Sequence, residues 1–284
     1  MFIQRYSPSL ILRPYIEAIM VQDDFNAVNF SNRNSVKVLP STMTVIGIQY
    51  GQPMKLLENH KSIPMSSSGI TGMHATVKEY LGTGAIGTVI ISFKPGGLSH
   101  FTRYPIHEFQ NADVSLDLVF PPKDVREMEE KLAEASSATE RVDIVQQFLL
   151  SALRDNVDEL LIQTAAQAII RHQGSLSIER LAAQLYVSKR TLERRFNTLI
   201  GTSPKQFAGI VRFQQTIRLH YAGYDYLDIV QACGYTDHAH LSKDFKSFAG
   251  TSPEQFFRSE VQPELKRSLH DNEPLSGPSE HLYY

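Results

Sequence analysis

The sequence of 284 residues has a single cysteine, Cys233, and no long run of apolar residues. One cysteine cannot form a disulfide within the chain, and it excludes a zinc site made of several cysteines. A membrane-spanning helix needs roughly 20 consecutive apolar residues, and no stretch approaches that length. The first ten residues, MFIQRYSPSL, lack the basic and apolar segments of a secretory signal. We therefore expect a soluble, cytoplasmic protein that does not bind membranes.

The chain also lacks a strong excess of either charge. Its formal net charge at pH 7 is −2, which argues against strong non-specific binding to nucleic acid. Residues 157–260 carry 12 Lys and Arg against 10 Asp and Glu, so this segment is only mildly basic. If the segment binds DNA, local geometry must provide most of the recognition.

The motifs of common enzymes are missing as well. There is no GxSxG turn, no HExxH motif, no Walker lysine and no arrangement typical of a Cys–His nucleophile. His238 and His240 lie two positions apart in a predicted helix, which places them on different faces, and no third ligand is near. Gly96-Gly97 lacks the spacing of a phosphate-binding loop, so a simple turn is favoured over an anion site. The sequence predicts no enzyme, no cofactor and no metal.

The first third of the chain contains short β-branched and aromatic runs, separated by Gly, Pro, Ser and Asn, which predict strands. The predicted strands are residues 36–40, 44–50, 54–58, 76–81 and 86–94. Closely spaced short strands are typical of an antiparallel barrel or sandwich. The segment PMSSSG at 64–69 predicts a turn.

From about residue 96 the pattern becomes helical. Two segments, 121–135 and 136–153, place apolar residues at helical spacing and predict an αα-hairpin. The predicted apolar stripes are Val125, Met128, Leu132 and Ala135 in the first helix, and Val142, Val145, Phe148, Leu149 and Ala152 in the second. Such a hairpin can pack on the β-rich part or form a dimer seam, and the sequence does not choose.

Composition divides the chain into three parts. The polar run RDNVDE, at 154–159, predicts a boundary between an N-terminal domain of residues 1–155 and a helical domain of residues 156–260. Residues 261–284 are rich in proline and poor in apolar groups, which predicts a disordered tail. The predicted fold class is α+β, with a β-rich barrel or sandwich and a helical hairpin before an all-α domain. Helices are predicted at 157–172, 178–185, 189–200, 204–221, 227–233, 238–249 and 253–260.

The helical domain contains an internal repeat. GTSPKQF at 201–207 and GTSPEQF at 250–256 differ at one position and lie 49 residues apart. Around them, each copy reads as a short helix, a tight turn, a second helix, a glycine, and a Ser-Pro pair that starts a third helix. Gly201 and Gly250 are expected to end the second helices at positive φ.

Further local signals define where the helices begin. Ser203 and Ser252 are expected as N-caps, each with a proline at the first helical position. Ser188 is expected to cap the helix that begins at residue 189. In the tight turn, Gly234 of the second copy corresponds to Tyr186 of the first, which predicts a turn of different construction in the first copy.

Two helices joined by a tight turn form a helix-turn-helix, whose second helix can enter the DNA major groove. In both copies an apolar face is expected in the core, with Leu192 and Phe196 corresponding to Leu241 and Phe245. The opposite faces are Lys189, Arg190, Glu193, Arg194 and Asn197 in the first copy, and His238, Ala239, Ser242, Lys243 and Lys246 in the second. Arginine can bridge guanine O6 and N7, and glutamate can accept from cytosine N4. The first copy is therefore expected to dominate base recognition.

The pattern LAAQLYVSKRTLERRF, followed by GTSP and then by GYTDHAHLSKDFKSFAGTSPEQF, resembles the DNA-binding domain of the AraC/XylS family of bacterial transcription regulators. The resemblance covers about 100 residues. It implies two helix-turn-helix subdomains joined by a long helix at 204–221, which read two adjacent major-groove segments of double-stranded DNA. It also implies RNA polymerase as a partner and suggests a homodimer and a small-molecule effector.

The resemblance assigns roles to particular residues. The base contacts that it implies are Arg190, Glu193, Arg194, His238, Ala239 and Lys243. The phosphate contacts that we expect are Ser188, Lys189, Thr191, Asn197, Lys205, Ser242 and Lys246. The segment FKPGGLSHFTRYPIHEF, at 93–109, resembles an uncharacterised sensor-like domain that often precedes this module, and His74, His100 and His107 are candidate effector-binding residues.

An alternative hypothesis is a ligand-binding or scaffold protein whose DNA-binding module is weakened. The near-neutral charge motivates it, as does Asp244, a carboxylate next to Lys243 in the sequence. A flat salt dependence of DNA binding would favour this alternative, because phosphate contacts give a steep dependence.

Overall fold

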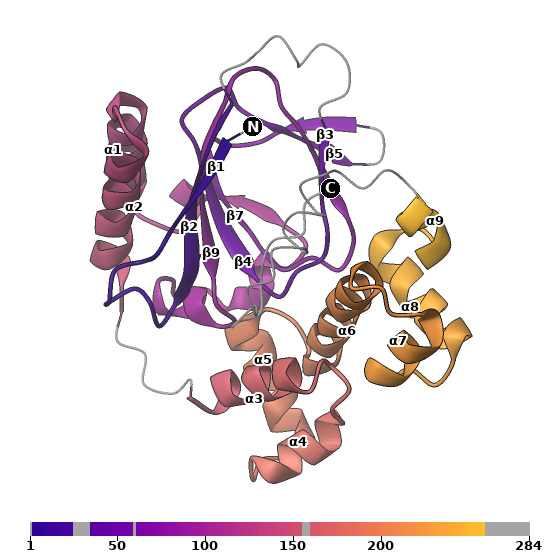
Figure 1. Ribbon diagram of the computed structural model, residues 1–284. Helices are drawn as coiled ribbons and strands as arrows, with labels where there is room; N and C mark the ends of the chain where they lie inside the picture. The colour runs from indigo at the N-terminus through magenta and orange to yellow at the C-terminus, as the bar shows by residue number, and fades with distance from the viewer. Residues whose placement is uncertain (1, 25–34, 59–60, 155–159, 259–284) are drawn as a thin grey trace.

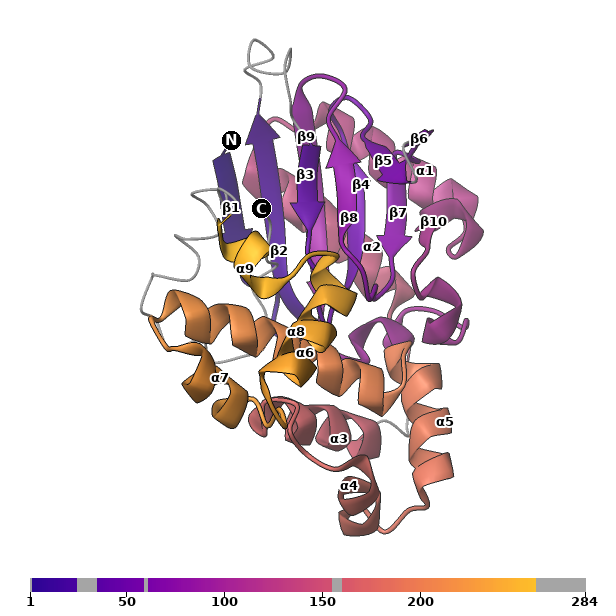
Figure 2. The same ribbon diagram turned by 90° about the vertical axis from the view of Figure 1, so that its right-hand side faces the viewer.

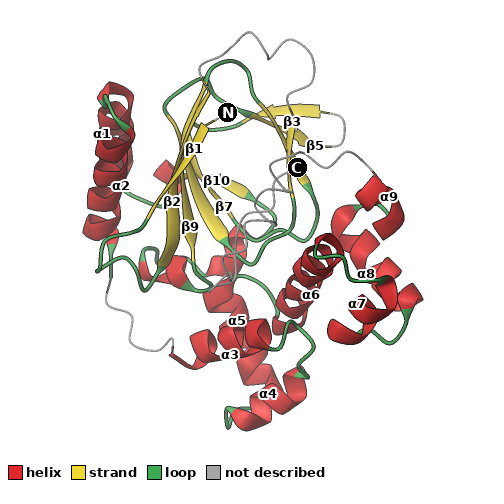
Figure 3. Cartoon of the chain, viewed as in Figure 1, coloured by secondary structure: helices red, strands yellow, loops and turns green. Residues whose placement is uncertain are grey.

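The computed structural model describes residues 2–24, 35–58, 61–154 and 160–258. Two antiparallel sheets form most of the N-terminal part, whereas helices form the C-terminal part (Figure 1). Figure 3 shows this division directly, with the strands in yellow and the helices in red. The fold class is therefore α+β, as predicted. The predicted tail at 261–284 and the boundary residues 155–159 lie outside the described residues.

The two sheets of the N-terminal part face each other as an open sandwich, not a closed barrel. The larger sheet has the order β1 (Phe2–Tyr6), β2 (Ile16–Asp24), β9 (Ile86–Phe93), β4 (Thr44–Gln49), β7 (Ser68–Thr71) and β10 (Asp113–Ser115). The smaller sheet has the order β3 (Ser35–Val38), β8 (Lys78–Leu81), β5 (Lys55–Glu58) and β6 (Lys61–Pro64). Strand β9 is buried on both faces, which explains its nearly continuous apolar sequence.

The turn predicted at 64–69 is shorter than expected. Strand β6 ends at Pro64 and β7 begins at Ser68, so only the three residues between them connect the strands. Ser68 and Gly69 instead pair with Ile48 and Gly47 in β4. Pairing with a central strand thus overrides the turn preference of serine and glycine, because ladder hydrogen bonds are long-range contacts that a local composition does not report.

A helical hairpin covers the outer face of the larger sheet (Figure 2), while the smaller sheet covers its inner face. It consists of α1 (Pro122–Glu134) and α2 (Ala138–Ala152), close to the predicted bounds. Most of the predicted stripe residues are buried in one cluster with Val21 and Ile91 of the sheet. Of the two roles that the sequence left open, packing on the β-rich part is therefore observed. Three short 3-10 helices, η2 (Gly97–His100), η3 (Ile106–Phe109) and η4 (Leu116–Leu118), complete this part.

The C-terminal part consists of helices at the predicted positions. They are α3 (Leu160–Arg171), α4 (Ile178–Gln184), α5 (Lys189–Ile200), α6 (Pro204–Tyr221), α7 (Tyr226–Ala232), α8 (His238–Ala249) and α9 (Pro253–Arg258). One core joins α3, α4, α5 and the first half of α6, and a second core joins the rest of α6 to α7, α8 and α9. The long helix α6 therefore belongs to two subdomains at once.

The N-terminal part packs directly on both of these cores. Met73 is buried in the core of the first subdomain, and Leu39 is buried in that of the second. The Gln110 Nε2 amide donates to Thr202 Oγ1 and Gln206 Oε1, both at 2.9 Å, next to the start of α6. These contacts fix the helical part against the sandwich.

Candidate nucleic-acid interface

The recognition helices α5 and α8 begin at side-chain caps. Ser188 accepts a hydrogen bond from the Thr191 backbone N–H at 3.1 Å, and Asp237 accepts from that of His240 at 2.7 Å. Both helices end at glycines in the left-handed region, Gly201 with φ of 98° and Gly250 with φ of 76°. The caps orient the first turn of each helix, which is the part that meets base edges in a helix-turn-helix.

The two tight turns have the same construction, which corrects the expectation of different turns. Tyr186 has φ of 54° and Gly234 has φ of 70°. In each copy the residue at positive φ donates to the carbonyl three positions back, and the next residue donates to the carbonyl five positions back. Tyr186 is 96% exposed, so its side chain is not crowded by neighbouring residues in this strained conformation.

The opposite faces of α5 and α8 are exposed as predicted, while Leu192, Phe196, Leu241 and Phe245 are fully buried. The exposed predicted contacts are Lys189, Arg190, Arg194, Lys205, His238, Ala239, Lys243, Lys246 and Ser188. Those that are partly exposed are Thr191, Glu193, Asn197 and Ser242. The predicted residues therefore lie at the surface. They are grouped on one face of each recognition helix, except for Ser188 at the cap of α5 and Lys205 at the start of α6.

Four of the predicted phosphate contacts have side-chain partners in the protein, namely Ser188, Lys189, Thr191 and Ser242. The Lys189 ammonium pairs with Glu179 at the start of α4. The hydrogen bond from Lys189 lowers the pKa of Glu179 to about 2, and Glu179 in turn raises the pKa of Lys189. The Ser188 hydroxyl lies 2.8 Å from Thr191 Oγ1 in addition to its capping bond. A phosphate at this corner has to compete with Glu179 for the lysine.

Asp244 does not point toward the side of α8 that carries Lys243. Its carboxylate lies 3.4 Å from the Arg212 guanidinium of α6, and the Asp244 side chain is 21% exposed. The charge that motivated a weakened second subdomain is therefore directed into the domain, toward an arginine. Sequence proximity to Lys243 was misleading because successive helical residues point in different directions.

His238 and His240 have separate neighbours, as their spacing predicts. The His238 ring lies against Tyr226, with ring centroids 5.3 Å apart, and His240 Nδ1 lies 3.2 Å from Thr236 Oγ1. Within the described residues, no cluster of His, Cys, Asp and Glu is suited to hold a metal. Cys233 is fully buried and lies 3.8 Å from Thr216 Oγ1.

The three candidate effector histidines are not brought together. His100 is buried against Tyr15, and His107 is exposed on η3. His74 lines the two cavities between the sheets, and its ring Nδ1 lies 2.6 Å from the Thr76 carbonyl oxygen. Burial lowers the pKa of His74 to about 4, so its ring is neutral near pH 7.

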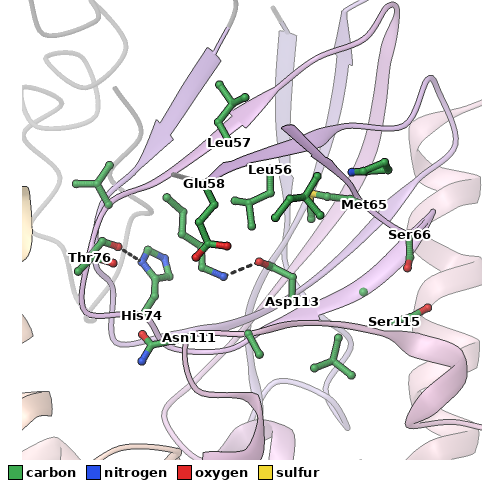
Figure 4. Close-up of a pocket in the computed structure, with 17 residues that line it drawn as sticks. Leu56, Leu57, Glu58, Met65, Ser66, His74, Thr76, Asn111, Asp113 and Ser115 are labelled. Carbon is green, nitrogen blue, oxygen red and sulfur yellow. Dashed lines mark hydrogen bonds and ion pairs between the residues drawn. The ribbon is translucent and has the colours of Figure 1, made fainter. Parts of the chain in front are cut away.

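A cavity of about 580 Å³ opens between the two sheets at the β6 and β10 edges. Figure 4 shows Leu56, Met65, His74 and Asp113 around it, with Asp113 paired to Lys78 at 2.6 Å. A second cavity of about 130 Å³ lies between the sheets and shares Met65 and His74 with the first. The described lining of the second cavity contains methionines and aliphatic residues together with uncharged polar residues such as Gln22, Gln49 and Thr88, and it has no Lys, Arg, Asp or Glu.

Comparison with known proteins agrees with this description. Residues 181–259 match the family model of a helix-turn-helix domain, and residues 4–115 match a domain of unknown function, DUF6597. No curated protein matches the chain. No helix in the described ranges is long and apolar enough to cross a membrane.

The chain is also similar to solved structures of other proteins. ToxT from Vibrio cholerae with a bound unsaturated fatty acid has 12% sequence identity and a TM-score of 0.43, over 89% of this chain and 96% of that chain. ToxT from strain O395 with a naphthalenyl butenoic acid derivative has 12% identity and a TM-score of 0.44, over 90% and 98%. The AraC-like transcriptional activator CuxR has 13% identity and a TM-score of 0.22, over 76% and 78%.

The match of residues 181–259 to a helix-turn-helix domain agrees with the doubled motif, the two capped helices α5 and α8, and the long helix that joins them. The chain is a DNA-binding transcription regulator, with a helix-turn-helix domain at residues 181–259 that follows a domain of unknown function at residues 4–115.

Proposed function

We propose that α5 and α8 read bases in two adjacent major-groove segments of one DNA duplex. On α5, Arg190 and Arg194 donate to guanine and Glu193 accepts from cytosine, while His238, Ala239 and Lys243 contact bases from α8. The observation that carries this proposal is that these side chains are exposed or partly exposed on both helices. Both helices also pack on the same long helix, α6.

Phosphate contacts set the position of the protein on the duplex but carry no sequence information. We assign this role to Ser188, Lys189, Thr191, Asn197, Lys205, Ser242 and Lys246. Because these contacts neutralise phosphates and release their counterions, binding is expected to weaken steeply with salt. Lys189 has to leave Glu179 to make its contact.

The test is selection of genomic DNA fragments by the full chain, with the Arg190→Ala/Arg194→Ala double variant beside it. The wild type should enrich one shared motif that the double variant loses. Arg194→Ala alone should weaken binding by about 1–3 kcal/mol and relax the preference at one base position. Arg126→Ala, at an exposed position on the remote helix α1, serves as the matched control. Equal enrichment by wild type and double variant would rule out the assignment.

We further propose that a small molecule regulates DNA binding from the cavities between the sheets. The second cavity suits an uncharged, largely apolar ligand, because burying a charge without a partner is costly. The segment that carries His74 connects this site to DNA binding. Its neighbour Met73 enters the core of the first subdomain, and Ala75 and Val77 pack on that of the second.

A thermal-shift screen of the full chain against uncharged apolar compounds tests this second proposal. A genuine effector should raise the melting temperature of the wild type and change its affinity for the selected DNA motif. Gly47 lines the second cavity and has open space beside it. Gly47→Leu should therefore fill this cavity and abolish both the rise in melting temperature and the change in DNA affinity. Ligand effects that persist in Gly47→Leu would place the site elsewhere.

RNA polymerase and a second copy of the chain remain proposed partners, to be tested by transcription in vitro and by sedimentation.

A further inference from the structure

Arg212, at the middle of α6, bridges the two subdomains. Its Nη1 donates to the carbonyl oxygen of Gly174 at 3.0 Å, in the turn between α3 and α4 of the first subdomain. Its Nη2 lies 3.4 Å from Asp244 Oδ2, on the recognition helix α8 of the second subdomain. The guanidinium carbon also lies 5.6 Å from the centre of the Tyr235 ring. One side chain therefore holds an element of each subdomain.

The backbones of the two subdomains also approach closely at this point. Gly174 has φ of 75°, and a Cβ there would lie 2.2 Å from the Ala208 carbonyl oxygen of α6. Gly234 has φ of 70°, and a Cβ there would lie 2.9 Å from Ser175 Cβ. The α3–α4 turn is thus packed against both α6 and the tight turn that precedes α8. We call Gly174, Ser175, Arg212, Gly234 and Asp244 the subdomain junction.

The first copy of the repeat shows that the tight turn itself does not require glycine. Tyr186 has the same backbone conformation as Gly234, but its side chain is almost fully exposed. The difference between the copies lies in the surroundings, since a side chain at Gly234 would meet Ser175 of the other subdomain, whereas Tyr186 is almost fully exposed. Glycine at 234 is explained by the close approach at the junction.

We propose that the subdomain junction fixes the separation and angle of α5 and α8, with Arg212 as its positioning residue. The junction then sets the spacing between the two DNA segments that the protein accepts. In a protein with two recognition helices, the spacing of the DNA segments follows from the geometry that joins them. This inference rests on the proposed reading of DNA by both helices.

The chemistry of arginine suits this role. Its planar guanidinium presents several N–H donors in a rigid fork, so it can hold a carbonyl oxygen and a carboxylate at once. Lysine is a flexible point charge and cannot reproduce this geometry. The Arg212 and Asp244 side chains are each only 21% exposed, so water and salt screen the pair less than a surface pair.

The experiment measures binding of the full chain to duplexes that carry the selected motif with one base pair inserted or deleted between its two segments. Wild type should lose about tenfold or more in affinity when the spacing changes, comparable to the loss of one good base contact. Arg212→Met should bind the native spacing about tenfold more weakly and should depend much less on spacing. Asp244→Asn should show the same trend, and Arg212→Lys should lie between wild type and Arg212→Met.

A matched control removes an ion pair elsewhere. Lys131→Met removes the exposed pair with Glu127 on α1, and its spacing profile should equal that of wild type. A variant with general loss of folding would bind every duplex more weakly in proportion, whereas loss of positioning changes the shape of the profile. If Arg212→Met fails to fold, Asp244→Asn decides the question.

The outcomes separate the inference from the function on which it rests. If wild type enriches no motif, or is indifferent to spacing, the proposed reading by two helices fails. If wild type depends on spacing and the profiles of Arg212→Met and Asp244→Asn match it, the junction does not set the spacing and the inference is overturned.

Discussion

Gly201 and Gly250 end the two recognition helices in the same backbone conformation, but their surroundings differ. A Cβ at Gly201 would lie 3.0 Å from the Ile106 carbonyl oxygen and 2.9 Å from Ile106 Cγ2, whereas nothing lies within 4 Å of the corresponding position at Gly250. Ile106 belongs to η3 of the N-terminal part. A single glycine therefore both ends α5 and permits its contact with the other domain.

This difference predicts unequal costs for the same substitution. Alanine in the left-handed region costs about 1–2 kcal/mol, so Gly250→Ala should destabilise the protein by that amount. Gly201→Ala should cost at least about 1 kcal/mol more, because a crowded Cβ also displaces η3 from α5. Urea denaturation of both variants measures the difference. Equal losses would show that the contact with Ile106 yields without cost.

His74 predicts a dependence of stability on acid pH. Burial lowers its pKa from 6.5 to about 4 in the folded protein. As the pH falls from 6.5 toward 4, the unfolded chain binds a proton that the folded chain does not, so stability falls. The loss of stability caused by His74 reaches about 3 kcal/mol once the pH is below the folded pKa, and it vanishes at pH values well above 6.5.

The measurement is urea denaturation at several pH values between 7 and 4, for wild type and for His74→Asn. Carboxylates contribute to both curves, so the difference between them isolates the histidine. The variant should lose less stability on acidification. Parallel curves would contradict the assigned pKa.

At the scale of elements, α6 differs from the other helices of the domain because its buried residues lie around most of its circumference. A helix with apolar residues on one stripe packs on one side, whereas α6 has partners on several sides. Phe207 packs against Phe196 in the first core, and Phe213 packs against Phe245 and Phe248 in the second. The sequence motif marks where α6 begins, but only these contacts make it the common element of two subdomains.

Truncation of the fully buried Phe213 should be among the most damaging single changes. Phe213→Ala removes a ring from the second core and should lower the free energy of unfolding by about 3–5 kcal/mol. The more exposed Phe257 is a suitable comparison, and its truncation should cost clearly less. Chemical denaturation tests this, and a loss below about 1 kcal/mol for Phe213→Ala would mean that the core closes over the gap.

At the scale of the whole molecule, the sandwich and the helical part are mechanically connected. Side chains from the N-terminal part complete both subdomain cores. Met73 is buried in the first core, and Leu39 is buried in the second, where Ala75 and Val77 also pack. The Gln214 side-chain amide also donates to the Pro40 carbonyl oxygen at 3.2 Å. The helical part alone therefore completes neither of its two hydrophobic cores.

This arrangement predicts that the two parts unfold together. Wild type should show one cooperative thermal transition, because opening the interface exposes apolar surface on both sides. The Leu39→Ala/Met73→Ala double variant should separate it into two transitions, and calorimetry measures this. Leu10→Ala, a truncation of a highly exposed leucine, is the control and should leave one transition. Two transitions already in wild type would contradict the coupling.

The sequence alone determined the helices of the C-terminal part, the caps at Ser188 and Ser203, the repeat and the helix-turn-helix domain. Helix signals are local, since a capping serine, a following proline and a terminal glycine lie within a few residues of each other. Ser188, Pro204 and Gly250 have their predicted positions for this reason. The core positions Phe196 and Phe245 follow from the helical period alone.

Only the tertiary structure decided what depends on distant partners. Strands β1, β2, β6, β7 and β10 lie outside the predicted ranges, and their place in the sheets is set by pairing with other strands. The direction of Asp244 depends on Arg212, and the need for glycine at 234 depends on Ser175 of another subdomain. Residues such as Met73 and Leu39, which join two domains, look like ordinary apolar residues in sequence. Their role is fixed by long-range packing, which no local pattern encodes.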